Sequence, residues 1–201
     1  VMLALPRNTV TRFQSNNPDI LLSLEEVTTE AALDMADEGE VDIALVGSTP
    51  HYLQDFDIEL IVKTGIYLYV PTRSPLSQKT SLTLQNLDGQ PFITTGKRNH
   101  LHRYFIEKCT SVGVRPRILF TTSDIALLIE QAERRQACYF GFPPTIKEEQ
   151  SETHILKPVD IGREPWFGTY AVRKKDAVLS DAAHIFWLYL ANEIAGSRNK
   201  Q

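Results

Sequence analysis

The sequence predicts an α/β protein, and three observations support that class. Segments with helical spacing of apolar residues alternate with short apolar runs along the 201-residue chain, as in βαβ units. The run Val41–Val46 is almost continuously apolar, which favours a strand covered on both faces, as in a parallel sheet. Hydrophobic residues make up 42% of the chain, enough for a core without disulfides or metals.

The N-terminal part predicts two helices separated by a strand. Apolar residues spaced by three and four lie on one face of the first helix, which ends at Asn16–Asn17–Pro18. Alternation of apolar residues predicts a strand over 20–24. Thr28 is a suitable N-cap for the second helix and Gly39 a suitable C-cap. The first apolar face consists of Leu3, Pro6, Val10 and Phe13.

The rest of the chain continues the alternation. Helices are predicted around 102–112, ended by Gly113, and around 125–132, with Thr122 or Ser123 as the N-cap. A last helix opens at Ser180 and ends at Gly196. Strands are predicted at 58–62, 66–70, 91–95, 117–121, 137–142, 155–156 and 166–172.

Composition excludes several classes of function. The formal net charge of −4 argues against a broad basic face for nucleic acid. No apolar run reaches the roughly 18 residues of a membrane span, and no signal peptide is recognisable. Cys109 and Cys138 lie in apolar stretches, as expected of buried thiols in a reducing cytoplasm. The chain starts at Val1, which leaves open that it is a fragment.

An ordered set of motifs resembles the LysR-type transcriptional regulators. Pro18–Glu25 is followed, after one helix, by Gly39–Leu45. Ser74–Pro75–Leu76 then precedes Leu84, Leu87, Gly89 and Pro91–Phe92–Ile93, and Arg173–Asp176 precedes Leu179–Ala183. No single motif is decisive, but the resemblance covers nearly the whole chain.

The resemblance implies a type 2 periplasmic-binding-protein fold, in which two Rossmann-like lobes are joined by two hinge strands. Lobe I would comprise 1–70 plus 170–201 and lobe II 71–169, with hinges near Tyr67–Pro71 and Phe167–Val172. The family's helix-turn-helix domain is absent from this chain, and so is the first strand of its sensor domain. Arg134–Arg135–Gln136 stands where the family usually has glycines, so the turn before Ala137 is expected to differ.

Hydroxyl side chains gather at the predicted carboxyl ends of strands, where open α/β sheets bind ligands. Two of these ends precede helices, whose free N–H groups favour anions. In the family, the matching loops line the effector pocket between the lobes. Each hydroxyl could instead cap a helix or satisfy a strand end. We expect a small anionic ligand to contact Ser48, Thr94, Thr95, Thr121 and Ser123, with Phe142 as an apolar wall.

These features predict a sensor that needs no cofactor, not an enzyme. His100 and His102 lack a supporting third ligand for a metal, and no nucleophile motif is present. The resemblance implies a homodimer or homotetramer, with 6–20 packing against 123–134 of a partner, and DNA contacts only through the missing domain. The alternatives are an extracytoplasmic solute-binding protein, an enzyme such as a dehydratase or deaminase, and a sensor that has lost effector binding.

Overall fold

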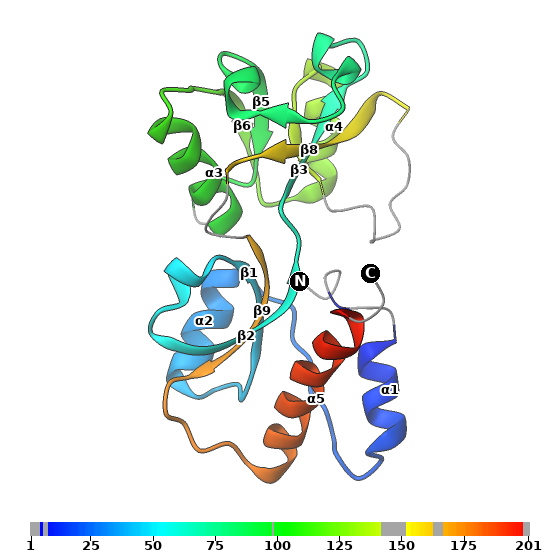
Figure 1. The fold of residues 1–201 in the computed structure, drawn as a ribbon, viewed down its shortest axis with the longest axis vertical. Coiled ribbons are helices and arrows are strands. Elements are labelled where there is room, and N and C mark those ends of the chain that lie inside the picture. The colour runs from blue at the N-terminus through cyan, green and yellow to red at the C-terminus, as the bar shows by residue number, and fades with distance from the viewer. Residues whose placement is uncertain (1–4, 6–7, 98, 142–151, 163–166, 199–201) are drawn as a thin grey trace. The chain divides into compact units, whose positions relative to one another are not determined.

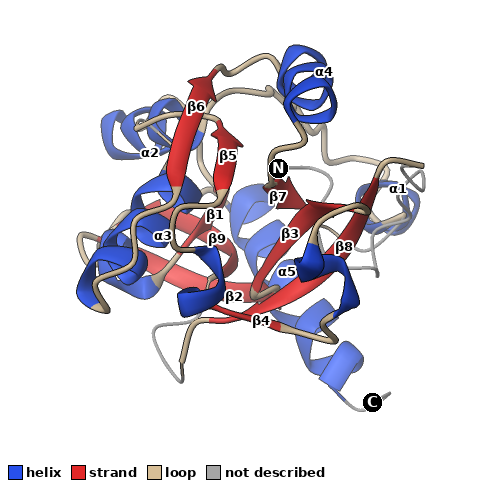
Figure 2. Ribbon diagram, turned by 90° about the horizontal axis from the view of Figure 1, so that it is seen from above, coloured by secondary structure: helices blue, strands red, loops and turns tan. Residues whose placement is uncertain are grey.

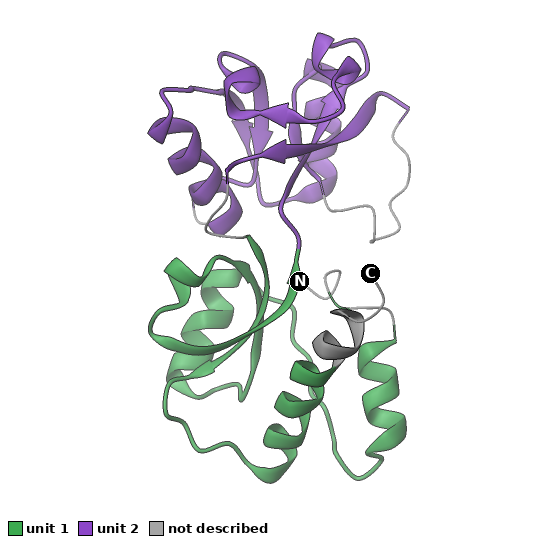
Figure 3. Ribbon diagram, viewed as in Figure 1, with its two compact units in different colours: residues 1–63, 165–201 green, residues 64–164 purple. Residues whose placement is uncertain are grey.

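The computed structural model describes residues 5, 8–97, 99–141, 152–162 and 167–198, with the side chains of 193–198 left aside. The chain divides into two compact units, residues 1–63 with 165–201 and residues 64–164 (Figure 3). The chain therefore passes between units after residues 63 and 164, ahead of the positions 70 and 169 expected from the sequence.

Unit 1 is a three-stranded antiparallel sheet with helices on both faces (Figure 1). The central strand β9 pairs with β1 on one side and β2 on the other. Thr28 caps the second helix by accepting a hydrogen bond from the Ala31 amide, and Gly39 ends that helix at φ +76°, as predicted. The elements are α1 (Thr9–Asn16), α2 (Thr29–Glu38), β1 (Ala44–Ser48), β2 (Phe56–Lys63), β9 (Gly168–Lys174) and α5 (Asp181–Arg198).

Successive residues of β9 face the two halves of the unit 1 core. Tyr170 and Val172 pack with Leu33 of α2 on one face. Ala171 packs on the other face in a cluster that includes Phe13 of α1 and Trp187 of α5. This alternation is the period-two geometry of a strand, and it fixes which helices cover which face.

Unit 2 consists of a four-stranded sheet in the order β4-β8-β3-β7 and a parallel pair β5-β6, seen side by side in Figure 2. Cys138 links the two through an isolated bridge to Phe92 of β5. Phe92 stacks on Phe105 of α3, whereas the next residue, Ile93, packs with Leu128 of α4. The elements are β3 (Ile66–Pro71), β4 (Leu82–Thr83), β5 (Pro91–Thr94), α3 (His100–Ser111), β6 (Arg117–Thr121), α4 (Ile125–Arg135), β7 (Tyr139–Gly141) and β8 (His154–Asp160).

The two stretches expected to act as hinges lie largely within these sheets. Tyr67–Pro71 belongs to β3 and pairs with β8 in unit 2. Gly168–Val172 belongs to β9 and pairs with β1 in unit 1. Each stretch is thus held by the ladder hydrogen bonds of a single unit.

The predicted strand over 20–24 is wrong, because residues 17–28 form no strand. Ile20 and Leu22 pack against the cluster around Phe13, while the side chains of Leu21 and Leu24 are 93% and 51% exposed. The alternation therefore agrees with the partial burial of Ile20 and Leu22 but not with the exposure of Leu24. A strand also needs a neighbouring backbone for its hydrogen bonds, and none of the described residues supplies one here.

The strand predicted at Val41–Val46 begins later, at Ala44, and its pairing is antiparallel rather than parallel. Ala44 and Val46 face the cluster that contains Leu33, and Leu45 packs against the opposite cluster. The apolar run thus correctly indicated coverage on both faces. Burial of both faces of β1 does not require parallel pairing, because helices pack on both faces of this antiparallel sheet.

Two predicted helix boundaries also differ. The N-cap of α4 is Asp124, whose carboxylate accepts from the Leu127 amide at 3.0 Å, rather than Thr122 or Ser123. The Thr122 hydroxyl instead accepts from the Asp124 amide at 3.1 Å and orients the cap. At the C-terminus, α5 continues past Gly196 to Arg198.

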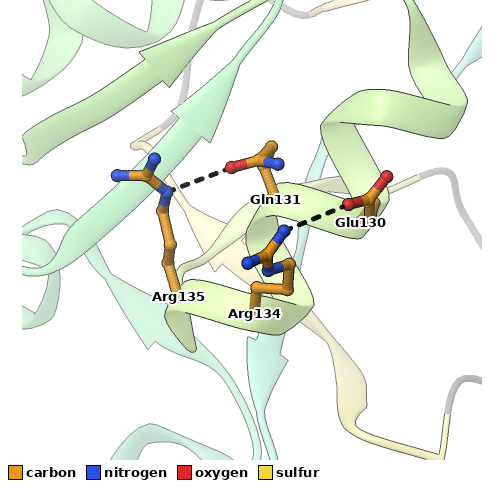
Figure 4. Close-up of polar contacts among 4 residues, drawn as sticks. All are labelled: Glu130, Gln131, Arg134 and Arg135. Carbon is orange, nitrogen blue, oxygen red and sulfur yellow. Dashed lines mark hydrogen bonds and ion pairs between the residues drawn. The ribbon is translucent and has the colours of Figure 1, made fainter.

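The turn at the end of α4 takes the left-handed conformation without a glycine. Gln136 has φ 49° and ψ 49°, and its N–H contacts the carbonyls of Ala132 and Glu133. Arg134 pairs with Glu130 and Arg135 with Gln131 along the helix surface (Figure 4). Gln136 therefore forms this turn with a side chain in a strained backbone conformation.

Candidate functional site

Ser48 ends β1 in unit 1, where it pairs with Gly168 of β9. Its side chain is completely buried, and its hydroxyl donates to the carbonyl of Thr49 at 3.4 Å. That distance is long for an O–H···O bond.

Thr49, which follows Ser48, is a second buried polar group at this strand end. It is completely buried, and its hydroxyl has no hydrogen-bond partner among the residues that the structure describes. An unsatisfied buried hydroxyl costs about 1–3 kcal/mol, so such a group calls for an explanation. Only its place next to Ser48 at a strand end could have signalled it.

In unit 2, the carboxyl ends of β5 and β6 bring Thr94 and Thr121 together. The two residues are register partners in the parallel pair, and the Thr122 amide donates to the Thr94 carbonyl at 3.1 Å. A side chain at Gly96 would lie 3.6 Å from the Thr121 Cβ, so the loop after β5 folds back over β6. Ser123 follows on the same connection and, like Thr121, is exposed.

The Thr94 hydroxyl is held by His102. Thr94 is fully buried, and its Oγ1 lies 3.1 Å from Nδ1 of His102. Burial, followed by the charge of Lys97, lowers the pKa of His102, so the neutral ring is favoured. Asn99, the N-cap of α3, fixes this part of the helix by accepting from the amides of Leu101 and His102.

Thr95 presents a different environment from Thr94. Thr95 as a whole is half-buried, but its hydroxyl oxygen is fully buried and has no hydrogen-bond partner within the described parts of the chain. The remaining expected contact, Phe142, lies outside the described residues. The structure thus groups Thr94, Thr95 and Thr121 within unit 2.

Several titratable groups lie outside this cluster of hydroxyls. Burial, followed by the charge of Arg103, lowers the pKa of His100 to about 4. Burial raises the pKa of both Cys109 and Cys138 to about 12, as expected of thiols that act as apolar packing. Across the described residues, no three His, Cys, Asp or Glu side chains gather as metal ligands would. No helix in that part of the chain is long and apolar enough to cross a membrane.

The chemistry of these groups suits binding by hydrogen bonds. A hydroxyl can donate to a ligand oxygen or accept from a ligand N–H or O–H. The first amides of α3 and α4 are partly used by their caps, Asn99 and Asp124, so the helix N-termini contribute less to anion binding than the sequence suggested. The hydroxyls therefore remain the main candidates for ligand contacts.

Comparison with known proteins identifies the relatives of this chain. A family model described as the LysR substrate binding domain matches residues 7–195. The HTH-type transcriptional regulator AlsR of Bacillus subtilis (strain 168) is 25% identical over 122 residues, which cover 60% of this chain and 40% of that protein. The RuBisCO operon transcriptional regulator of Allochromatium vinosum is 24% identical over 191 residues, which cover 91% of this chain and 60% of the regulator.

Solved structures show the same fold at low sequence identity. The effector binding domain of BenM, solved with its effector benzoate, has a TM-score of 0.77 and 13% identity over all of this chain and 90% of that one. The regulatory domain of Synechocystis PCC6803 CcmR, in complex with 2-PG, has a TM-score of 0.76 and 18% identity, covering 93% of this chain and 89% of that one. The predicted periplasmic-binding-protein-like α/β fold is thereby confirmed.

Proposed function

We propose, from the premise that this chain belongs to the LysR substrate-binding-domain family, that it is the effector-sensing part of a DNA-binding transcriptional regulator. The observation that carries this proposal is the family match over residues 7–195. The chain spans only 40% and 60% of the two regulators' lengths, so DNA binding would belong to a part of the protein outside this sequence. The relatives are regulators, which disfavours the alternative of a solute-binding protein that serves a transporter.

The proposed ligand is a small metabolite that is anionic at neutral pH. Related effector-binding domains have been solved with benzoate and with shikimate, and both are carboxylates. The hydroxyls described above can donate to carboxylate oxygens. We propose Ser48, Thr94, Thr95, Thr121, Ser123 and Phe142 as ligand contacts, and we add Thr49 because its buried hydroxyl lacks a partner in the described chain.

A thermal-shift screen of carboxylate metabolites tests this proposal. A ligand present at 100 times its dissociation constant stabilises the folded state by about 2.7 kcal/mol. With a ligand in hand, Thr95→Val and Ser123→Ala should weaken the shift. Thr110→Val provides the matched control, because Thr110 is an exposed threonine near the far end of α3.

The proposal of effector binding fails if no metabolite class raises the melting temperature and the site variants leave a transcriptional reporter unchanged. That combined outcome would favour a family member that has lost effector sensing. A shift that Thr110→Val reduces as strongly as Thr95→Val would place the ligand elsewhere in the chain.

We also propose that the protein forms a homodimer or homotetramer in the cytoplasm and acts as a binding protein, not as an enzyme. Exposed apolar side chains support assembly. Leu21 and Leu24 are 93% and 51% exposed after α1, and Ile125 and Ile129 are 58% and 36% exposed on α4. Ile125 and Ile129 lie in the 123–134 segment expected to contact residues 6–20 of a partner, and Leu21 and Leu24 directly follow that second segment.

Light scattering coupled to size exclusion tests the assembly. Leu21→Asp or Ile125→Asp should lower the assembly state, because either would bury a charge in the interface. Val178→Asp is the control, since Val178 is 99% exposed and lies outside both segments. A protein that is monomeric at all concentrations, or that dissociates equally with the control, would contradict this interface.

A further inference from the structure

A chain of hydrogen bonds joins the start of β8 to the end of α4 in unit 2. His154 is 3% exposed, and its Nε2 lies 3.0 Å from the carbonyl oxygen of Ala137. Its Nδ1 lies 2.9 Å from the hydroxyl of Thr153, and that hydroxyl lies 3.0 Å from Oε1 of Glu133. We call these four groups the His154 chain.

The number of protons decides whether all three contacts of the His154 chain can be hydrogen bonds. A carbonyl and a carboxylate only accept, so Nε2 must carry a proton and the one proton of Thr153 must go to Glu133. The Thr153 oxygen can then only accept, which requires a second proton on Nδ1. The three contacts are complete only when His154 is an imidazolium ion.

The neutral ring leaves the chain one proton short. With Nε2 protonated and Nδ1 bare, the Thr153 hydroxyl can donate to His154 or to Glu133, but not to both. If the hydroxyl donates to His154, the Thr153 and Glu133 oxygens face each other without a hydrogen between them. If it donates to Glu133, the Thr153 oxygen faces the bare Nδ1 of His154. One proton therefore decides whether Glu133 is connected to His154.

We propose that the His154 chain is a proton-dependent latch. Uptake of one proton by His154 turns the Thr153 hydroxyl toward Glu133 and completes a continuous connection from α4 to the Ala137 carbonyl. Loss of that proton breaks this connection at one of the two contacts of the Thr153 hydroxyl. This inference does not rest on the proposed function of the domain.

Among the described residues, Glu133 is the charged group that shifts the pKa of His154. Burial lowers the pKa of His154, while the hydrogen bond to Ala137 and the charge of Glu133 raise it. From β7, the ring of Tyr139 lies 5.3 Å from the imidazole, and from β3, Tyr69 stacks on Tyr139. Glu152, the neighbour of Thr153 in sequence, is exposed.

The cations at the end of α4 are engaged on the helix surface rather than at the latch. Arg134 lies 3.6 Å from Glu130, and the Nε of Arg135 donates to Gln131 at 3.2 Å (Figure 4). The latch also closes on a strained turn, because Ala137 follows Gln136 with its left-handed backbone. The hydrogen bond from His154 Nε2 to the Ala137 carbonyl therefore holds in place a turn that its own sequence does not favour.

Nitrogen-detected NMR of the five histidines, followed through a pH titration, tests the latch. We expect neutral His154 to carry its proton on Nε2, and we expect both Glu133→Gln and Thr153→Val to lower its pKa. Thr153→Ser keeps a hydroxyl and should leave the pKa close to the original. Glu130→Gln, which removes a neighbouring carboxylate from the same helix, is the matched control and should have no effect.

A double variant separates the latch from simple attraction through space. Glu133→Gln should shift the His154 pKa less in the Thr153→Val background than in the original protein, because the connection is already cut. An equal shift in both backgrounds would overturn the latch, as would a neutral ring protonated on Nδ1. Thr153 is exposed and Glu133 only half-buried, so these substitutions leave the core intact.

Discussion

Replacing Gly168 by alanine should destabilise unit 1 through a clash with backbone. Gly168 lies in the central strand, paired with Ser48 on one side and Lys63 on the other. A Cβ at this position would lie 2.6 Å from the carbonyl oxygen of Val62 and 2.9 Å from Cδ1 of Leu60. The leucine side chain can turn away, but the carbonyl belongs to β2 and can move only by disturbing its ladder.

The magnitude of this effect follows from three contributions. Overpacking by one methyl group in a rigid site costs about 1–3 kcal/mol. A weakened ladder hydrogen bond adds up to about 1 kcal/mol. The lower entropy of an unfolded alanine offsets about 0.4–1 kcal/mol. We therefore expect Gly168→Ala to lower the free energy of unfolding by about 1–3 kcal/mol.

Urea denaturation followed by far-UV circular dichroism measures this loss. Gly47→Ala is the matched control, because it lies in the adjacent strand and its new Cβ would meet the Phe167 ring at an ordinary 3.5 Å. The control should change stability by less than about 0.5 kcal/mol, as most non-clashing substitutions do. If Gly168→Ala is no more destabilising than Gly47→Ala, the clash argument is wrong.

Three further predictions concern stability. Arg173 lies 3.0 Å from the Asp57 carboxylate and 5.0 Å from the centroid of the Trp187 ring. A double-mutant cycle between Arg173 and Asp57, measured by urea denaturation, should give a coupling energy of about 1–2 kcal/mol. A coupling energy near zero would contradict this prediction. Gln136→Gly should be neutral or stabilise by up to about 1 kcal/mol in thermal unfolding, while Gln136→Ala should not stabilise, because only glycine relieves the left-handed strain. Burial lowers the pKa of His100 to about 4 in the folded protein, so between pH 6.5 and pH 4 the unfolded state binds a proton that the folded state does not. The free energy of unfolding should therefore fall as the pH is lowered through this range. His100→Asn should reduce this pH dependence in urea titrations, and an unchanged pH dependence would contradict the prediction.

The sequence was sufficient for features that depend on near neighbours. Thr28 and Ser180 were recognised as N-caps, and each hydroxyl accepts from an amide three residues later. The bounds of β6, Arg117–Thr121, were predicted correctly because β-branched and aromatic residues lie between a proline and a turn. The ordered motifs also led to the family, since family resemblance survives in local sequence.

Contacts between distant segments had to come from the tertiary structure. The alternation at 20–24 indicated the partial burial of Ile20 and Leu22, but it could not indicate whether a partner backbone is present. Thr94 was expected to face a ligand, and whether it does so remains a prediction; the structure shows that its hydroxyl is bonded to His102, one helical turn into α3.

The direction of β1 illustrates the same division. An apolar run specifies that both faces of a strand are covered, because burial is a property of each side chain. It does not specify the partner, and here the partner is β9, from the opposite end of the chain. Local patterns thus determined most of the helices and strands, the caps Thr28, Gly39 and Ser180, and the family. Strand pairing and the hydrogen-bond partners of Thr94, Gln136 and His154 were decided by residues that only folding brings together.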